Sequence, residues 1–183
     1  MNTWITSDLH FGHNNILKYC PNTRGHFRDV SHMNEEMIHL WNDSVLPTDT
    51  VYLLGDIAFS NSTEAIKILK RLNGRKILIE GNHDRKNLRD PVFRNCFEEI
   101  HNYLEITYNK ISIIMFHYPI AEFNLQFRGA VHFHGHCHGN PSGIGEYRAV
   151  DVGYDATGQV VNRIEDMIQL ALKGKIKESH RNM

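Results

Sequence analysis

The sequence predicts a layered α/β sandwich with helices on the outside. Its first half alternates short apolar runs with amphipathic segments, and its second half is rich in paired apolar runs. The 183 residues suit one domain, which we place at residues 1–174, with a polar, mobile tail at 175–183. A domain of this size buries roughly two thirds of the surface that its unfolded chain exposes, so we expect a core without disulfides.

The first half of the chain carries three apolar runs of strand length. We place these strands at residues 2–6, 50–54 and 76–79. Turn-forming residues over 21–30 predict a loop, and short helices are expected around residues 14–19 and 87–96.

Two longer helices are predicted between these strands. The first covers residues 32–45, with Ser31 as its N-cap, because apolar side chains recur there at helical spacing. The second covers residues 62–72, because Asn61 and Glu64 have the spacing of a capping box. Both helices are long enough to cover a sheet face.

The second half is richer in strand pairs. Two apolar runs separated by a two-residue turn predict a β-hairpin over residues 103–108 and 111–116. Short strands are expected at 130–134 and 148–153, and an amphipathic helix over 162–173 closes the domain.

Composition narrows the function classes. The net charge of −1 argues against strong non-specific binding to nucleic acid. No apolar stretch approaches the roughly 20 residues that span a bilayer, and no secretory leader is visible, so we expect a cytoplasmic protein without a membrane partner. Three cysteines without a C-x-x-C motif indicate neither a disulfide framework nor a zinc ribbon. Thirteen histidines are many for this length and motivate a search for a metal site.

Five polar motifs share one position, directly after a predicted strand. They are Asp8-x-His10, Gly55-Asp56, Gly81-Asn82-His83-Asp84, His117 and Gly135-His136-x-His138. Because strand ends on one sheet edge converge in space, we expect these motifs to form one site. In D-x-H and H-x-H, alternate residues of an extended segment point the same way, so both side chains can face one pair of metals.

The chemistry of the set is that of a metal centre. Two carboxylates, four imidazoles and one amide oxygen suit Mn, Fe, Zn, Ni or Co better than calcium or a thiolate site. Seven candidate ligands exceed what one tetrahedral zinc takes and fit two ions that share a bridging carboxylate. Asp8 and Asp56 could instead be helix N-caps and Asn82 could shape a turn, but these alternatives leave the partner histidines unexplained.

The order D-x-H, G-D, G-N-H-D, H, G-H-x-H resembles that of the calcineurin-like metallophosphoesterases, and the matching motifs run from Asp8 to His138. The stretches DLHFGHNNI and VDVGYDATG look most like small bacterial and phage-type members. The resemblance implies a four-layer α/β/β/α sandwich with a dinuclear metal site at the C-terminal ends of the strands.

The resemblance also implies a role for each motif residue. One ion would be held by Asp8, His10 and His138, and a second by Asn82, His117 and His136. Asp56 would bridge both ions. His83, with Asp84 beside it, would lie over the substrate phosphate as the catalytic pair without binding metal.

The implied activity is hydrolysis of a phosphoester by a metal-bound hydroxide. We expect two divalent ions, with Mn placed first and Fe, Zn, Ni or Co as alternatives. Without a cap domain or basic groove in the sequence, a small phosphodiester is the expected substrate, and a phosphomonoester such as a nucleotide is the alternative. A non-catalytic interaction scaffold on the same fold is the rival from another class.

For four further residues, the sequence is compatible with either a role in substrate binding or a purely structural role. His13 contacts substrate or the groups behind the ligands, or has only a structural role. Arg85, Arg128 and Arg148 either hold a phosphate oxygen or are structural. The sequence makes no prediction about the oligomeric state.

Overall fold

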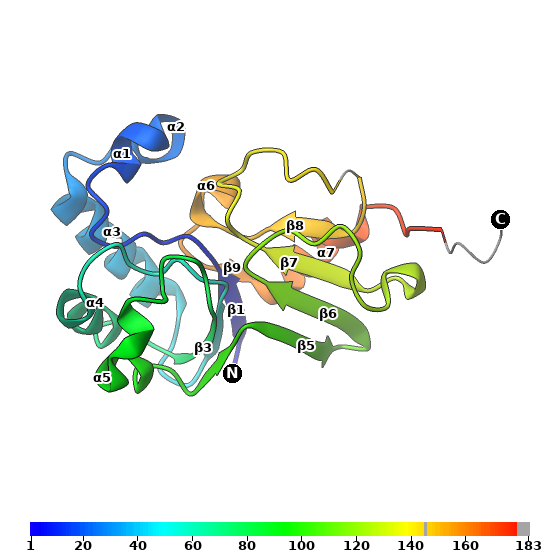
Figure 1. Cartoon of the computed structure of the whole chain (residues 1–183), viewed down its shortest axis with the longest axis horizontal. Helices are drawn as coiled ribbons and strands as arrows, with labels where there is room; N and C mark the ends of the chain where they lie inside the picture. Colours follow the sequence, from blue (N-terminus) through cyan, green and yellow to red (C-terminus); the bar gives the residue numbers. More distant parts are fainter. Residues whose placement is uncertain (145, 179–183) are drawn as a thin grey trace.

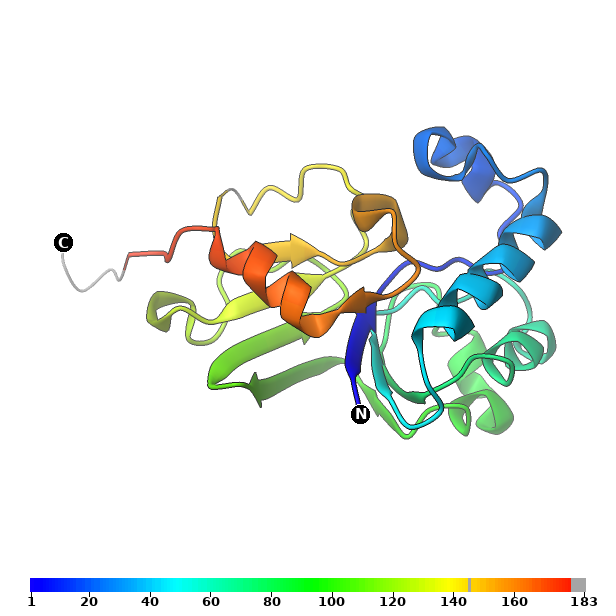
Figure 2. The same ribbon diagram turned by 180° about the vertical axis from the view of Figure 1, so that it is seen from behind.

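The computed structural model describes residues 1–144 and 146–178 and contains two β-sheets with helices around them (Figures 1 and 2). The first sheet has the strand order β4-β3-β2-β1-β9. Its strands are β1 Thr3–Thr6, β2 Thr50–Leu53, β3 Arg75–Ile79, β4 Glu99–His101 and β9 Asn162–Arg163. Strands β1 to β4 are parallel to one another, and β9 pairs antiparallel with β1.

The second sheet has the order β5-β6-β7-β8. Its strands are β5 Tyr103–Tyr108, β6 Ile111–Phe116, β7 Val131–His134 and β8 Ala149–Asp151. The predicted hairpin is confirmed as the antiparallel pair of β5 and β6, whereas β6, β7 and β8 are parallel. Both sheets are therefore mixed, and each contains parallel strands that end at a common edge.

Helices gather on one side of the first sheet, and α7 lies beside the second sheet (Figures 1 and 2). The α-helices are α1 Ile16–Tyr19, α2 Pro21–Arg24, α3 Val30–Ser44, α4 Ser62–Leu69, α5 Pro91–Arg94, α6 Tyr154–Thr157 and α7 Ile164–Leu172. Two 3₁₀ turns are η1 Asn87–Arg89 and η2 Gln126–Arg128. Within the described ranges, no helix has both the length and the apolar character needed to cross a membrane.

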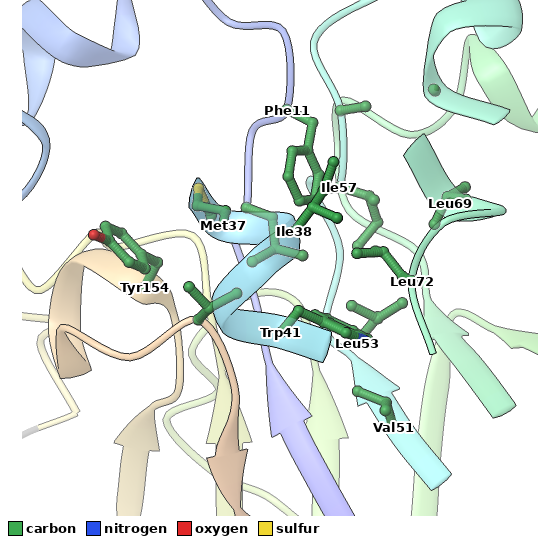
Figure 3. Packing of buried hydrophobic residues seen from close by; sticks show 14 of the residues in the cluster. Phe11, Met37, Ile38, Trp41, Val51, Leu53, Ile57, Leu69, Leu72 and Tyr154 are labelled. Carbon is green, nitrogen blue, oxygen red and sulfur yellow. The ribbon is translucent and has the colours of Figure 1, made fainter. Parts of the chain in front are cut away.

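The outer face of the first sheet packs against α3 and α4 (Figure 3). Met37 and Trp41 of α3 are fully buried over Val51 and Leu53, which point to the same face of β2. Burying each such side chain contributes roughly 1.5–3 kcal/mol. The Trp41 indole N–H donates to the Asn73 carbonyl at 3.0 Å, so its polar atom is satisfied as well.

The two sheets face each other through a second apolar cluster. Ile5, Leu54 and Ile79 from the first sheet meet Met115 and Phe133 from the second, all fully buried. Helix α7 contributes its buried side chains to the same cluster and contacts β1, β7, β8 and β9. Each sheet is thus buried on the face that it turns to the other. The predicted α/β fold class is confirmed.

The helix boundaries correct two local expectations. Ser31 is not the N-cap of α3; Asp29 is, because its carboxylate accepts the backbone N–H of His32 at 2.8 Å. Asn61 does cap α4, since its side chain accepts the Glu64 N–H at 3.0 Å. A cap is decided by which short polar side chain reaches a free amide of the first turn.

The sequence patterns did not predict several other elements correctly, because these elements are very short. The expected helix over 87–96 is split into η1 and α5, since Asp90 has extended backbone before Pro91. The expected loop 21–30 contains α2, and β4, α6 and β9 were not predicted. Of the expected tail, residues 179–183 lie outside the described ranges, whereas Lys175 forms a β-bridge with Tyr147. The domain boundary at residue 174 stays a prediction.

Candidate metal centre

The parallel strands of both sheets deliver the five motifs to one edge of the molecule. Thr6 and Leu53 lie in register at the ends of β1 and β2, and Asp8 and Asp56 follow them. His117 follows β6 in the same way. The two sheets join at this edge, because the segments after β1 and β8 form a parallel bridge, Ser7 to Gly153.

Five of the seven predicted ligands have left-handed backbone. Their φ angles are 55° at Asp8, 52° at His10, 54° at Asp56, 67° at His136 and 50° at His138. The expectation that alternate residues of an extended segment carry these side chains is therefore wrong. Left-handed turns aim them instead, at a cost of about 1–3 kcal/mol for each strained residue. Strain concentrated in this way is typical of functional sites.

Two glycines allow the backbone to approach the carboxylates. A Cβ at Gly81 would lie 2.4 Å from Asp56 Oδ1, and a Cβ at Gly135 would lie 2.3 Å from Asp8 Oδ2. No real side chain tolerates such contacts, so both positions require glycine. The glycines of the G-N-H-D and G-H-x-H motifs thus serve the carboxylates of other motifs.

Asp56 presents one free oxygen to the centre of the cluster. Its Oδ1 accepts the backbone N–H of His83 at 2.9 Å, which fixes the carboxylate. Its Oδ2 lies 3.8 Å from His10 Nε2, 3.6 Å from His117 Nε2 and 3.8 Å from His83 Nε2. One oxygen surrounded by imidazoles from different motifs is the arrangement that a bridging ligand needs.

In Asp8, too, one carboxylate oxygen accepts a backbone N–H and the other faces the cluster. Its Oδ2 accepts the His136 N–H at 2.9 Å. Its Oδ1 lies 3.9 Å from His10 Nε2 and 3.8 Å from His138 Nε2. Asp8 Oδ1 and both ring nitrogens of His10 are buried and have no hydrogen-bond partner among the described residues. Asp8, His10 and His138 form a group whose ligand atoms lie within 4.8 Å of one another.

A backbone carbonyl orients the His117 ring. Its Nδ1 donates to the Leu54 carbonyl at 2.7 Å, which leaves the lone pair of Nε2 facing inward. That lone pair meets Asn82 Oδ1 at 3.0 Å and Asp56 Oδ2 at 3.6 Å. Three acceptor atoms pointed at one another repel unless a cation lies between them. The His136 ring is exposed and stands 5.2 Å from the His117 ring, between centroids.

A buried network behind His138 was missed by the sequence reading. The His138 Nδ1 donates to Asp155 Oδ2 at 2.7 Å, and Arg24 Nε donates to Asp155 Oδ1 at 2.9 Å. The fully buried Arg24 also donates to the Asp8 and Leu9 carbonyls, at 2.6 and 2.9 Å. Asp155 lies in the VDVGYDATG stretch, but nothing in sequence spacing pairs it with Arg24, 131 positions away.

The pKa shifts within the metal-free cluster differ from one candidate ligand to the next. Burial lowers the pKa of His10 to about 2, helped by nearby His138 and Arg24, so its imidazole is neutral near pH 7 and one ring nitrogen keeps a lone pair for a cation. Burial raises the pKa of Asp8 to about 6, because its carboxylate is removed from water. Burial lowers the pKa of His138, but the Asp155 hydrogen bond and the charges of Asp8 and Asp155 outweigh it and raise the net pKa. A buried carboxylate that is costly to ionise gains most from a bound cation.

The structure corrects the expected pairing of His83 with Asp84. The buried Asp84 carboxylate accepts the backbone N–H groups of Asp56, Gly81 and Ile57, at 2.9, 2.9 and 3.0 Å. It thus holds the two loops together instead of orienting the His83 ring. His83 itself is 39% exposed and packs edge-on against Phe59, with ring centroids 4.8 Å apart.

The remaining candidates for substrate binding differ in their surroundings. Arg148 donates to the Gly129 and Gly174 carbonyls and is structural. Arg85 lines a pocket together with Asn82 and His83. His13 stacks on Phe59 at 4.1 Å beside His10. The donor set, the orphaned atoms of Asp8 and His10 and the facing acceptors of His117 and Asn82 fit divalent cations.

No model of a known protein family matches the chain. The uncharacterized protein MJ1445 of Methanocaldococcus jannaschii is 31% identical over 182 residues, covering 94% of this chain and 93% of the relative. The Gene 66 protein of Mycobacterium phage L5 is 28% identical over 197 residues, covering 90% and 91%. The crystal structure of AQ665, a protein of unknown function from Aquifex aeolicus, superposes with a TM-score of 0.72 at 25% identity, covering 92% of this chain and 98% of that one.

Fold and site together define the class of this protein. Two mixed sheets with the ordered motifs at their common edge make it a two-sheet α/β protein with a candidate metal centre. Within that class, the chain belongs to the same family as MJ1445.

Proposed function

We propose that the protein hydrolyses phosphoesters with two divalent ions, of which manganese is our first choice. One observation carries this proposal. Asp56 Oδ2 lies within 3.8 Å of imidazole nitrogens from three different motifs, while the neighbouring Asp8 Oδ1 is buried without a partner. The first ion would be held by Asp8, His10 and His138, the second by Asn82, His117 and His136, with Asp56 shared by both.

Bound ions would lower the pKa of a water molecule to make a nucleophile and would stabilise the phosphoryl oxygens. The protein supplies the orientation. The Leu54 carbonyl and the Asp155 carboxylate fix which ring nitrogen His117 and His138 present. His83 is the exposed imidazole beside this cluster, and we assign it to the substrate, where it would stabilise the developing charge or protonate the leaving oxygen.

A phosphodiester is the substrate that the surroundings of His83 favour. One pocket of about 670 Å³ and another of about 490 Å³ both have His83 and Phe59 in their walls. A phosphodiester has two ester arms, one for each pocket, whereas a phosphomonoester has a single arm.

The proposal is tested by metal reconstitution. Metal-free protein is loaded with Mn, Ni, Zn, Mg or Co and assayed on bis(p-nitrophenyl) phosphate and p-nitrophenyl phosphate. We expect metal-dependent turnover that is higher on the diester. Asp56→Asn should lose more activity than His10→Gln, because it removes a negative charge that both ions share. Asp166→Asn, an exposed change on α7, is the matched control. No turnover with any ion on either ester would favour the scaffold function instead.

A further inference from the structure

The two pockets beside His83 differ in chemistry. The larger one, here called the basic pocket, is lined by Arg85, Lys86 and Arg89 together with Asn82, His83 and Phe59. The smaller one, the aromatic pocket, is lined by His13, Tyr19 and Phe59, and no lysine or arginine is among its lining residues. A substrate held at the metal centre therefore has cations in one neighbouring pocket and aromatic side chains in the other.

The positive charge of the basic pocket is not neutralised. No carboxylate is among its lining residues. Arg85 contacts the half-buried Glu80 at 3.4 Å, but the Arg85 side chain is itself largely exposed, so this ion pair is worth little. Lys86 and Arg89 have no ion pair within residues 1–144 and 146–178. In a chain whose net charge is −1, such a concentration of free cations creates a local field that attracts anions.

The segment that carries these cations is anchored at both ends. Asp84 holds its start through three backbone amides and also accepts the Leu88 N–H at its own carbonyl, at 2.9 Å. Asn87 is buried and donates to the Ser60 carbonyl across the pocket at 3.2 Å. Asp90 closes the segment by capping α5 and by accepting the Ser62 hydroxyl at 2.6 Å. A fixed backbone places the cations before a ligand arrives, which lowers the entropy cost of binding.

We propose that the basic pocket binds a second phosphate group of the substrate. The preferred substrate is then a phosphodiester that carries a further phosphate on one arm, as a 5′-phosphorylated dinucleotide does. This inference rests on the proposed phosphoesterase function. Asn82 and His83 line the pocket and also belong to the metal centre, so a phosphate one nucleoside away from the scissile ester would reach Lys86 and Arg89. Phosphate oxygens form charge-assisted hydrogen bonds with both side-chain types.

The test compares two dinucleotides that differ by one phosphate. TpT and its 5′-phosphorylated form pTpT are cleaved by the metal-loaded protein, and diester cleavage is followed by separating the products. We expect kcat/KM for pTpT to exceed that for TpT by about tenfold or more, the size of one charge-assisted hydrogen bond. In the double variant Lys86→Gln, Arg89→Gln, the ratio of the two values should fall to about one.

The matched control removes the same amount of charge outside the pocket. Arg94→Gln on α5 combined with Lys173→Gln after α7 should keep the wild-type ratio, since both side chains are exposed and neither lines the pocket. A wild-type ratio near one, with TpT still cleaved, would overturn the second-phosphate site and leave the proposed function intact. A ratio that falls equally in the control variant would overturn it too, by reducing the effect to overall charge. Failure to cleave TpT, pTpT and bis(p-nitrophenyl) phosphate alike would reject the proposed function itself.

Discussion

In four of the candidate ligands, one polar side-chain atom forms a hydrogen bond that serves the fold, and the other polar atom faces the site. In Asp8 and Asp56, one carboxylate oxygen accepts a backbone N–H and the other is left for the centre of the site. In His117 and His138, one ring nitrogen donates to an oxygen behind it and the other faces inward. The same residue thereby serves the fold and the site. Replacing it tests both roles at once, so the residues behind the ligands are better probes.

Asp155 is such a probe. Asp155→Asn keeps the shape of the side chain but weakens the hydrogen bond that orients His138, which lies at 2.7 Å. We expect manganese affinity to fall about 10–100-fold, as for other partners of metal-binding histidines. Isothermal titration with Mn measures this loss, and Asp166→Asn serves as the control. Unchanged affinity, with an unchanged melting temperature of the metal-free protein, would show that Asp155 does not position the ligand.

His83 is the residue that we assign to substrate and not to metal. His83→Ala should keep both ions and reduce kcat about 10²–10⁴-fold, the usual contribution of a general acid or base. The loss should be smaller for p-nitrophenolate, which leaves without a proton, than for an alkoxide leaving group. Steady-state kinetics and elemental analysis of the same sample check this, with the exposed His39→Ala on α3 as the control. Loss of an ion would reveal that His83 is a ligand.

At the scale of elements, the start of the first sheet depends on one buried carboxylate. Asp49 Oδ1 accepts the Asn2 N–H at 2.7 Å, and its Oδ2 accepts the Trp4 indole N–H at 3.0 Å and the Leu46 N–H at 3.1 Å. Burial acts to raise the pKa of Asp49, but these hydrogen bonds and the N-terminal charge outweigh it and lower the pKa to about 2. Asp49 therefore ties β1 to the turn before β2 in its ionised form.

This carboxylate makes stability depend on pH in a defined direction. Because the folded pKa of about 2 lies below the ordinary value of 3.8, the contribution of Asp49 is present above about pH 4 and is lost as the pH falls towards 2. Asp49→Asn should lower the free energy of unfolding by about 2 kcal/mol at pH 7, as about 1.4 kcal/mol per pKa unit implies. The difference from wild type should vanish near pH 2. Urea unfolding at both pH values measures it, and a difference that is equal at both would contradict this origin.

At the scale of the whole molecule, the site joins the two sheets. Asp8 and Asp56 follow β1 and β2 of the first sheet, and His117 and His138 follow β6 and β7 of the second. Ions held between them would link the two halves at the edge where strained turns and orphaned polar atoms destabilise the metal-free fold. We therefore expect metal binding to be coupled to folding.

We expect manganese to raise the melting temperature. A ligand at about 100 times its Kd stabilises the folded state by about 2.7 kcal/mol per site, because it binds the native form alone. For a domain of this size that corresponds to roughly 5–10 °C. Thermal unfolding with chelator and with Mn gives the shift, and Asp56→Asn should abolish most of it. An equal shift in that variant would indicate that the stabilising ion binds elsewhere.

The sequence by itself determined the α/β class, the main strands and the identity of the candidate ligands. These follow from local patterns: apolar periodicity marks the strands, and polar motifs directly after them mark the sheet edge. It also anticipated the N-cap Asn61, although at α3 the neighbouring Asp29 reaches the free amide instead of Ser31. Features of this kind depend on residues that are close in sequence, so they can be predicted from the sequence alone.

Only the tertiary structure decided the orientation of the candidate ligands and the residues that hydrogen-bond to them. The left-handed backbone of Asp8 and His138 and the Arg24–Asp155 pair do not follow from any spacing in the sequence. Arg24 and Asp155 are 131 residues apart and meet because the bridge between Ser7 and Gly153 brings the ends of β1 and β8 together. Contacts of that range depend on how the sheets pack, and packing depends on the whole apolar core at once and not on any one segment.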